Sequence, residues 1–180
     1  MTETTEKQFL GSDIETALNS MAEAIVANHA ETLDLFLAGI AEGGVPIANR
    51  LAMKLKVLLG REIPQGVVDV SFHRDDIGSN PIPKITCPTE LPNNAEGGIC
   101  ILIDDVLHTG RTTRAALNEL FDQGRLDRIE LAVLVDRGNR KLPIQPDYVG
   151  FVEATSNNLT VTVEMDSNDP ANDSILIGNE

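Results

Sequence analysis

Basic residues are scarce in this chain. Its 180 residues include 14 Lys and Arg against 28 Asp and Glu, which gives a formal net charge of −14. Phosphate backbones are bound mainly by clustered Lys and Arg, so this balance argues against a general nucleic-acid-binding surface. A local basic patch is compatible with the sequence, but it must lie outside residues 151–180, which contain no Lys or Arg.

Long hydrophobic runs and cysteine clusters are also missing. Hydrophobic residues make up 42% of the chain, enough for a core, yet no stretch approaches the roughly 20 residues of a membrane-spanning helix. The polar, slightly acidic start predicts no secretory signal. Cys87 and Cys100 have no His or Cys nearby at metal-ligand spacing, so we expect reduced cysteines of a cytoplasmic protein.

Helical and apolar segments alternate along most of the chain, whose length suits one domain, 1–180. The first helix carries Ile14 and Leu18 at helical spacing behind a Ser12/Asp13 cap. Three strands are near-continuous apolar runs, which is typical of a parallel sheet covered on both faces. The sequence therefore predicts an α/β domain with a parallel twisted sheet flanked by helices, built from strands at 32–40, 66–72, 99–104 and 129–136 and helices at 12–28, 45–60 (ended by Gly60) and 111–124.

Two regions depart from this alternation. Residues 73–98 are rich in Pro, Asn and Gly and have no periodicity. A loop this long inside a compact domain is usually a lid or a binding loop, so we predict a flexible loop here. Residues 148–178 are predicted to be β-rich, with short strands at 148–152, 159–165 and 174–177. The last two of these strands predict a hairpin at a sheet edge or in a small hood.

Unusual residues follow three of the predicted strands. They form the segments "GIAEGGVP" (39–46), "DDVLHTGRTT" (104–113) and "DRGNRK" (136–141). Ligands of open parallel sheets bind beyond the carboxyl ends of the strands, so these segments predict one shared site. Asp104 and Asp105 are like charges side by side, and they need a cation, a polyol or solvent to satisfy them.

The turn after the acid pair is typical of an anion site, although such a turn can also simply cap a helix. Unpaired N–H groups and the helix dipole favour a phosphate at this position, and Thr109, Thr112 and Thr113 could add hydrogen bonds. Asp104 and Asp105 would then be within reach of the vicinal hydroxyls of a ribose, which donate to carboxylates. A magnesium ion bound mainly through substrate oxygens would relieve their repulsion.

These motifs resemble those of a known family. "ILIDDVLHTGRTT" (101–113) is similar to the phosphoribosyl-pyrophosphate signature of type I phosphoribosyltransferases. Together with "FHRDDI" (72–77), "LAVLVDRGNRKLPIQPDYVG" (131–150) and "GVPIANRLA" (44–52), it resembles bifunctional pyrimidine-operon regulators and uracil phosphoribosyltransferases over most of residues 20–178. The resemblance implies magnesium-dependent conversion of uracil and phosphoribosyl pyrophosphate to uridine monophosphate (UMP) and pyrophosphate, and a homodimer or homotetramer.

The resemblance also implies roles for individual residues. Asp104 and Asp105 would contact the ribose hydroxyls, and the turn after them would bind the 5′-phosphate. Arg137 would lie near the nucleobase, and Arg74 would lie at the root of a loop that closes over the substrate. The implied catalytic residues are therefore Asp104, Asp105 and Arg74, and the implied substrate-binding residues are Glu42, Gly43, Asp104, Asp105, Val106, Leu107, His108, Thr109, Gly110, Arg111, Thr112, Arg137 and Glu153.

Two stretches differ from the usual pattern of that family. Where the family reads close to "GIxTRGVPLA", with an arginine that holds pyrophosphate, this chain has Glu42 and Gly43. Loss of a charge-assisted hydrogen bond costs roughly 1.5–3 kcal/mol. Where the family reads close to "GKNIPTS", this chain has Phe151 and Glu153, and the Glu153 side chain either faces solvent or contacts the nucleobase. A nucleotide-sensing regulator with weak or lost catalysis is therefore an open alternative.

Regulators in that family that attenuate transcription bind messenger RNA through a basic surface. The strongly negative net charge weakens the case for RNA here, and each candidate residue can equally be a solvated surface charge. The candidates are Lys54, Lys56, Arg61, Arg125, Arg128, Arg140 and Lys141.

Overall fold

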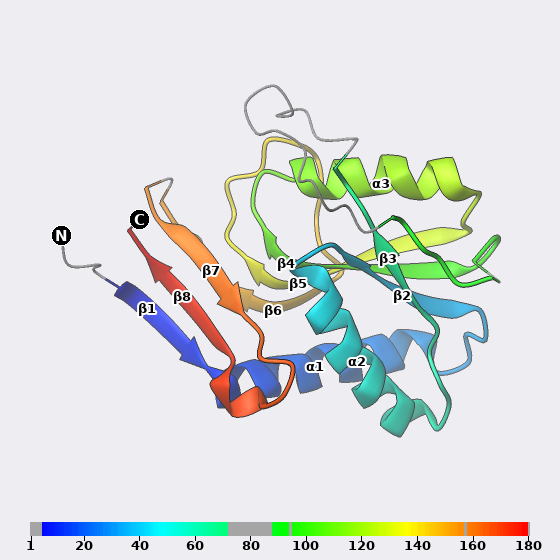
Figure 1. Cartoon of the computed structure of the whole chain (residues 1–180), viewed down its shortest axis with the longest axis horizontal. Helices are drawn as coiled ribbons and strands as arrows, with labels where there is room; N and C mark the ends of the chain where they lie inside the picture. The colour runs from blue at the N-terminus through cyan, green and yellow to red at the C-terminus, as the bar shows by residue number, and fades with distance from the viewer. Residues whose placement is uncertain (1–4, 72–87, 94, 157, 180) are drawn as a thin grey trace.

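The computed structural model describes residues 5–71, 88–93, 95–156 and 158–179 (Figure 1). Most of the predicted loop at 73–98, including Arg74, lies outside these residues. No helix within the described ranges is long and apolar enough to cross a bilayer. In chain order the elements are β1 (Thr5–Leu10), α1 (Gly11–His29), β2 (Leu35–Ile40), α2 (Gly44–Leu59), β3 (Gln65–Val68), β4 (Ile99–Leu107), α3 (Arg111–Gln123), β5 (Arg128–Asp136), β6 (Tyr148–Val152), β7 (Thr160–Glu164), the short 3-10 helix η1 (Pro170–Asn172) and β8 (Ser174–Gly178).

Five strands form the central sheet in the order β3-β2-β4-β5-β6, and every neighbouring pair is parallel. Helices α1 and α2 cover one face and α3 covers the other (Figure 1). Leu37 and Ile101 belong to the core on the α1 and α2 side, whereas Phe36 and Leu102 belong to the core under α3. Because both faces are buried, consecutive strand positions must be apolar. The predicted parallel α/β fold is confirmed.

The helix ends agree with the sequence except at one predicted cap. Helix α1 begins one residue earlier than predicted, and the Leu10 N–H donates to Oδ2 of Asp13 at 3.0 Å. Asp13 therefore supplies the acceptor at the helix start, where backbone N–H groups lack partners. Ser12 lies inside the first turn, so its prediction as a cap is wrong. Helix α2 ends before Gly60, which has a φ of +66°, as predicted.

A second, antiparallel sheet has the order β1-β8-β7 and forms a hood beside the main sheet (Figure 1). Strands β7 and β8 make the predicted hairpin, and β1, which the sequence analysis did not predict, pairs with β8. Strand β6 is not part of the hood, because it pairs in parallel with β5 and extends the main sheet. Local sequence carries little information on a strand's partner, because pairing joins residues that are far apart in the chain.

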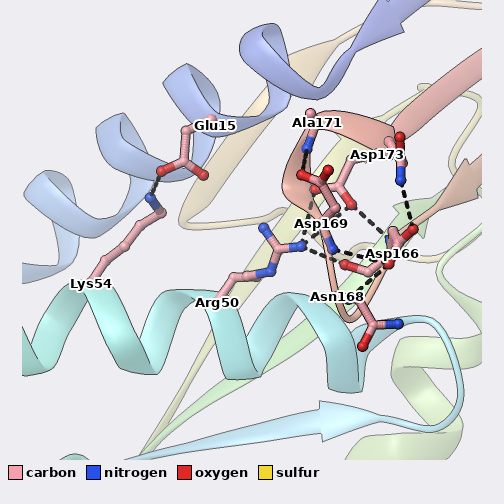
Figure 2. A network of polar contacts seen from close by, with 9 residues as sticks. Glu15, Arg50, Lys54, Asp166, Asn168, Asp169, Ala171 and Asp173 are labelled. Atoms are coloured by element: carbon pink, nitrogen blue, oxygen red, sulfur yellow. Dashed lines mark hydrogen bonds and ion pairs between the residues drawn. The ribbon is translucent and has the colours of Figure 1, made fainter.

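Buried charges attach the hood to α2 (Figure 2). Nη2 of Arg50 donates to the backbone carbonyl of Asp166 at 2.7 Å and lies 3.4 Å from both carboxylate oxygens of Asp173. Asp173 also accepts the N–H of Asp166 at 2.7 Å, so neither buried charge lacks a partner. One turn along α2, Lys54 pairs with Glu15 of α1. Helix α2 is thereby held to both the hood and α1.

Aromatic packing joins the hood to the edge of the main sheet. The rings of Phe9 on β1 and Phe151 on β6 have their centroids 4.3 Å apart. The Lys7 ammonium lies 4.7 Å from the centroid of the Phe9 ring and pairs with the Glu153 carboxylate. Such contacts combine apolar burial with a cation–π attraction. Phe151, one of the departures from the family pattern, is therefore part of the contact between the two sheets.

A buried polar cluster lies where β5 and β6 begin. One carboxylate oxygen of Glu130 accepts from the Tyr148 hydroxyl at 2.7 Å and lies 2.8 Å from Nε2 of His29, and the other lies 3.0 Å from Nε of Arg128. Burial alone would raise the pKa of Glu130, but these hydrogen bonds and the Arg128 charge outweigh it and lower the pKa. The ionised carboxylate is therefore favoured by the folded state.

We expect Glu130→Gln to lower the free energy of unfolding at pH 7 by about 1.5–3 kcal/mol, because charged hydrogen bonds are lost. A lowered folded-state pKa stabilises the protein above the unfolded-state pKa of about 4.3, and this contribution disappears as the pH falls through the folded-state value. The difference between wild type and variant, measured by urea unfolding, should therefore shrink on acidification. Glu164→Gln, at an exposed position on β7, is the control. An unchanged difference at low pH would contradict the prediction.

Candidate functional site

Both residues of the acid pair lie inside β4, whereas the predicted strand ended at Asp104. The strand continues to Leu107, three residues beyond its predicted end, and Asp104 is only 5% exposed. The Asp105 N–H donates to Oδ1 of Asp104 at 3.1 Å, and the Val106 N–H donates to Oδ1 of Asp105 at 2.7 Å. Both carboxylates are therefore held by the backbone that follows them. Each accepts only one of these bonds, which leaves acceptor capacity for a ligand.

Burial raises the pKa of Asp104 well above its ordinary value, and the neighbouring charge of Asp105 raises it further. Desolvation and a like charge both disfavour the ionised form, so the pair resists carrying two full negative charges. The folded state therefore favours the protonated form of Asp104 more than water does. A ligand that donates hydroxyl groups or brings a cation would favour ionisation again.

The turn that follows β2 lies directly against this pair. A Cβ atom added to Gly43 would lie 2.3 Å from Oδ2 of Asp105, and one added to Gly44 would lie 2.1 Å from the carbonyl oxygen of Ile103. Only glycine permits such an approach. Glu42, in the same turn, is exposed. Two of the three predicted strand ends therefore meet.

The predicted phosphate turn connects β4 to α3. Gly110 has a φ of +88°, and α3 begins at Arg111, whose N–H lies 3.3 Å from the Thr109 hydroxyl. Arg111 and Thr112 are exposed, whereas Thr113 is buried. The Thr113 hydroxyl has no hydrogen-bond partner in the described part of the chain. A glycine turn that leads into a helix N-terminus is a suitable anion site.

The third strand end holds this turn in place. In the segment 136–144, the N–H of Arg137 donates to the carbonyl of Leu107 at 3.0 Å. The N–H of Lys141 donates to the carbonyl of Thr109, also at 3.0 Å. All three strand ends predicted to share a site are therefore in contact at one edge of the sheet.

The Arg140 side chain crosses the interior of that segment. Its Nη1 donates to the carbonyls of His108 and Gly138 at 2.9 and 3.2 Å. Its Nε donates to the backbone carbonyl of Ile144 at 3.1 Å. Its Nη2 pairs with Oδ2 of Asp136 at 2.6 Å. Arg140 is one of the possible RNA contacts named above, and this bracing role was not predicted from the sequence. The available signal was the four-residue spacing from Asp136, directly after a strand.

The phosphate turn is electropositive. Burial lowers the pKa of His108, and the charges of Arg137, Arg140 and Lys141 lower it further. Three cations that disfavour a fourth also favour an anion at the same place. The site is therefore polarised, with cations around the turn and carboxylates on β4.

The remaining predicted site residues make contacts within the protein. Nε of Arg137 donates to the Thr155 hydroxyl at 3.0 Å and its Nη2 to the carbonyl of Leu159 at 2.5 Å. Burial lowers the pKa of Arg137. The Glu153 carboxylate pairs with Lys7, so in this structure it neither faces open solvent nor lacks a partner. A role for either residue at a nucleobase stays a prediction.

Val106 and Leu107 contribute through their backbone. The Val106 side chain packs against the core on the α1 and α2 side, and Leu107 is buried in the core under α3. Their side chains therefore stabilise the end of β4, while the carbonyl of Leu107 is used by the 136–144 segment.

Most of the candidate RNA-binding cations are engaged within the protein. Lys54 pairs with Glu15, and Lys56 pairs with Glu62. Arg61 donates to the backbone carbonyl of Thr32, in the turn between α1 and β2. Arg128 and Arg140 pair with the acids Glu130 and Asp136.

We expect Arg140→Gln to weaken binding of ribose 5-phosphate by about tenfold, equivalent to 1.4 kcal/mol, because the phosphate turn loses both its bracing and a nearby charge. Arg61→Gln is the matched control, since Arg61 also holds a backbone carbonyl but at the opposite end of the sheet. Calorimetric titration of both variants measures the effect. Equal affinity in Arg140→Gln and the control would show that the turn does not depend on Arg140.

Comparison with known proteins identifies the family. A sequence profile described as "Phosphoribosyl transferase domain" matches residues 10–168. "Bifunctional protein PyrR" of Pelotomaculum thermopropionicum is 43% identical over 159 residues, which cover 88% of each chain. The protein of the same name from Herpetosiphon aurantiacus is 43% identical over 177 residues, which cover 98% of this chain and 99% of the relative. The chain belongs to the PyrR family of phosphoribosyltransferases.

Solved structures of more distant phosphoribosyltransferases share the fold of this PyrR-family chain. A hypoxanthine-guanine phosphoribosyltransferase from Bacillus anthracis has a TM-score of 0.69 at 15% identity and covers 98% of both chains. The hypoxanthine phosphoribosyltransferase of Trypanosoma cruzi has a TM-score of 0.68 at 18% identity over 96% of this chain and 95% of that one. At such low identity, these similarities concern the fold alone.

Proposed function

We propose that this protein is a uracil phosphoribosyltransferase that also responds to pyrimidine nucleotides as a regulator. The observation that carries the proposal is the polarised site. Carboxylates on β4 suit the hydroxyls of a ribose, and the cation-lined turn before α3 suits its 5′-phosphate. Membership of the PyrR family supports the same ligand class.

In the proposed reaction the bond between C1′ of the ribose and the pyrophosphate oxygen breaks, and a bond between C1′ and N1 of uracil forms. Uracil N1 loses its proton, and pyrophosphate leaves. The ribose passes through an oxocarbenium-like state, so positioning and exclusion of water matter more than a strong base. Asp104 and Asp105 would orient the ribose, and residues 108–112 would fix its phosphate.

Magnesium fits this site only if the protein and the substrate share its coordination. No group of three or more His, Cys, Asp or Glu residues within the described ranges could hold a metal ion. The acid pair offers two carboxylates, and Mg²⁺ prefers six oxygen ligands, so substrate oxygens and water would supply the rest. When bound, the ion would neutralise charge on the pyrophosphate.

The test is a product assay with several bases. The full chain, with magnesium and phosphoribosyl pyrophosphate, is given uracil, hypoxanthine or guanine, and nucleoside monophosphates are separated and quantified. The proposal expects UMP from uracil and no product when Asp104 and Asp105 are both changed to Asn. Product from a purine alone would show that a purine, and not uracil, is the substrate. No product at high protein concentration would rule out the proposed enzymatic activity.

A second role beside catalysis is supported by the word "bifunctional" in the names of the relatives. We propose UMP as its signal and messenger RNA as the partner, with the protein acting as a homodimer or homotetramer. Affinity for a pyrimidine-operon leader RNA should then depend steeply on salt and on UMP. Absence of binding at low salt would leave the catalytic proposal standing alone.

A further inference from the structure

The backbone of the turn at 41–44 suits an anion, but the charged side chains at this turn do not. Helix α2 begins at Gly44, and the first N–H groups of a helix lack partners within it. A pyrophosphate next to the acid pair would need these groups. The Asp105 carboxylate lies directly against this turn, because a Cβ atom on Gly43 would lie 2.3 Å from its Oδ2.

We propose that the chain's own carboxylates close the pyrophosphate side of this site, so that it holds a nucleoside 5′-monophosphate in preference to phosphoribosyl pyrophosphate. The inference rests on the proposed function, because it concerns the same ribose-phosphate site. It makes the protein a nucleotide sensor first and a slow transferase second.

Charge differs sharply between the two sides of the site. Around the phosphate turn, Arg137, Arg140 and Lys141 lie close enough to affect His108. In the part of the chain that the structure describes, two acids lie at the turn at 41–44, the exposed Glu42 and the adjacent Asp105. One side therefore attracts a phosphate group, and the other repels a second one.

No cation is close in sequence to compensate for these acids. Residues 41–49 contain no Lys or Arg. Arg50 follows on α2, but its guanidinium is directed to the hood, where it binds Asp166 and Asp173 (Figure 2). Glycine at position 43 completes the arrangement, because any larger side chain would have to displace the Asp105 carboxylate.

The experiment compares three ligands on the full chain by titration calorimetry in excess magnesium: UMP, ribose 5-phosphate and phosphoribosyl pyrophosphate. We expect saturable UMP binding, and phosphoribosyl pyrophosphate should bind within about threefold of ribose 5-phosphate, as the extra pyrophosphate gains almost nothing. Glu42→Thr removes one repelling charge. It should strengthen phosphoribosyl pyrophosphate binding by roughly three- to fivefold and change ribose 5-phosphate binding less than twofold.

Glu31→Gln is the control, since Glu31 is an exposed acid on the turn between α1 and β2, at the opposite end of the sheet. It should change neither affinity. Wild-type binding of phosphoribosyl pyrophosphate more than about tenfold tighter than ribose 5-phosphate would overturn the inference and leave the proposed function intact. The inference also fails if Glu42→Thr gives no gain. If none of the three ligands binds, the inference and the proposed function fall together.

Discussion

Asp104→Asn is expected to stabilise the ligand-free protein and at the same time weaken its binding of ribose 5-phosphate. The folded state raises the pKa of this buried carboxyl, so ionisation at pH 7 costs folding free energy. Each unit of pKa elevation corresponds to about 1.4 kcal/mol, and Asn removes that cost. Loss of charge-assisted hydrogen bonds to ribose should weaken binding by roughly ten- to a hundredfold.

The sign of the pH dependence makes this prediction specific. A raised folded-state pKa means that the cost of ionisation is absent below the unfolded-state pKa of about 3.9 and grows as the pH rises towards the folded-state value. The gain in stability of the variant over wild type should therefore vanish at acid pH. Urea unfolding at several pH values, with the exposed Asp34→Asn as control, measures it. A destabilised variant at pH 7 would mean that Asp104 has a structural role.

Gly44→Ala is expected to lower the free energy of unfolding by about 3 kcal/mol, near the upper end for an overpacked position. The added Cβ would lie 2.1 Å from the carbonyl oxygen of Ile103, and a backbone atom in the central strand cannot rotate away. Gly44 has no need of glycine for its own conformation, because it lies in the first turn of α2. The whole loss would therefore be steric.

Gly43→Ala provides the comparison for this prediction. Its added Cβ would meet the Asp105 carboxylate, a side chain that can rotate, so the loss in stability should be clearly smaller. Urea unfolding measures both variants. Ligand titration should show a second difference, because displacement of α2 in Gly44→Ala would also separate the turn at 41–43 from the acid pair. Equal stability losses in the two variants would contradict this account.

The sequence by itself determined the parallel sheet and indicated most of the candidate site. Apolar runs at 99–104 and 129–136 predicted buried parallel strands, because only a sheet covered on both faces needs apolar residues at consecutive positions. The acid pair and the glycine turn could be found because all their residues are contiguous in the chain. Parallel strands end at one edge of the sheet, so the convergence of the three segments also followed from local patterns.

Only the tertiary structure decided which charges face the ligand and which are used inside the protein. Nothing in the sequence shows that the charged side chains of Arg140 and Glu153 have partners within the protein. Arg140 nevertheless braces the phosphate turn, and Glu153 pairs with Lys7, which lies near the opposite end of the chain. The contact of Asp105 with Gly43 and the pairing of β1 with β8 are equally non-local. Charge pairing and strand pairing depend on distances in space between residues that are far apart along the chain, and local patterns carry no record of those distances.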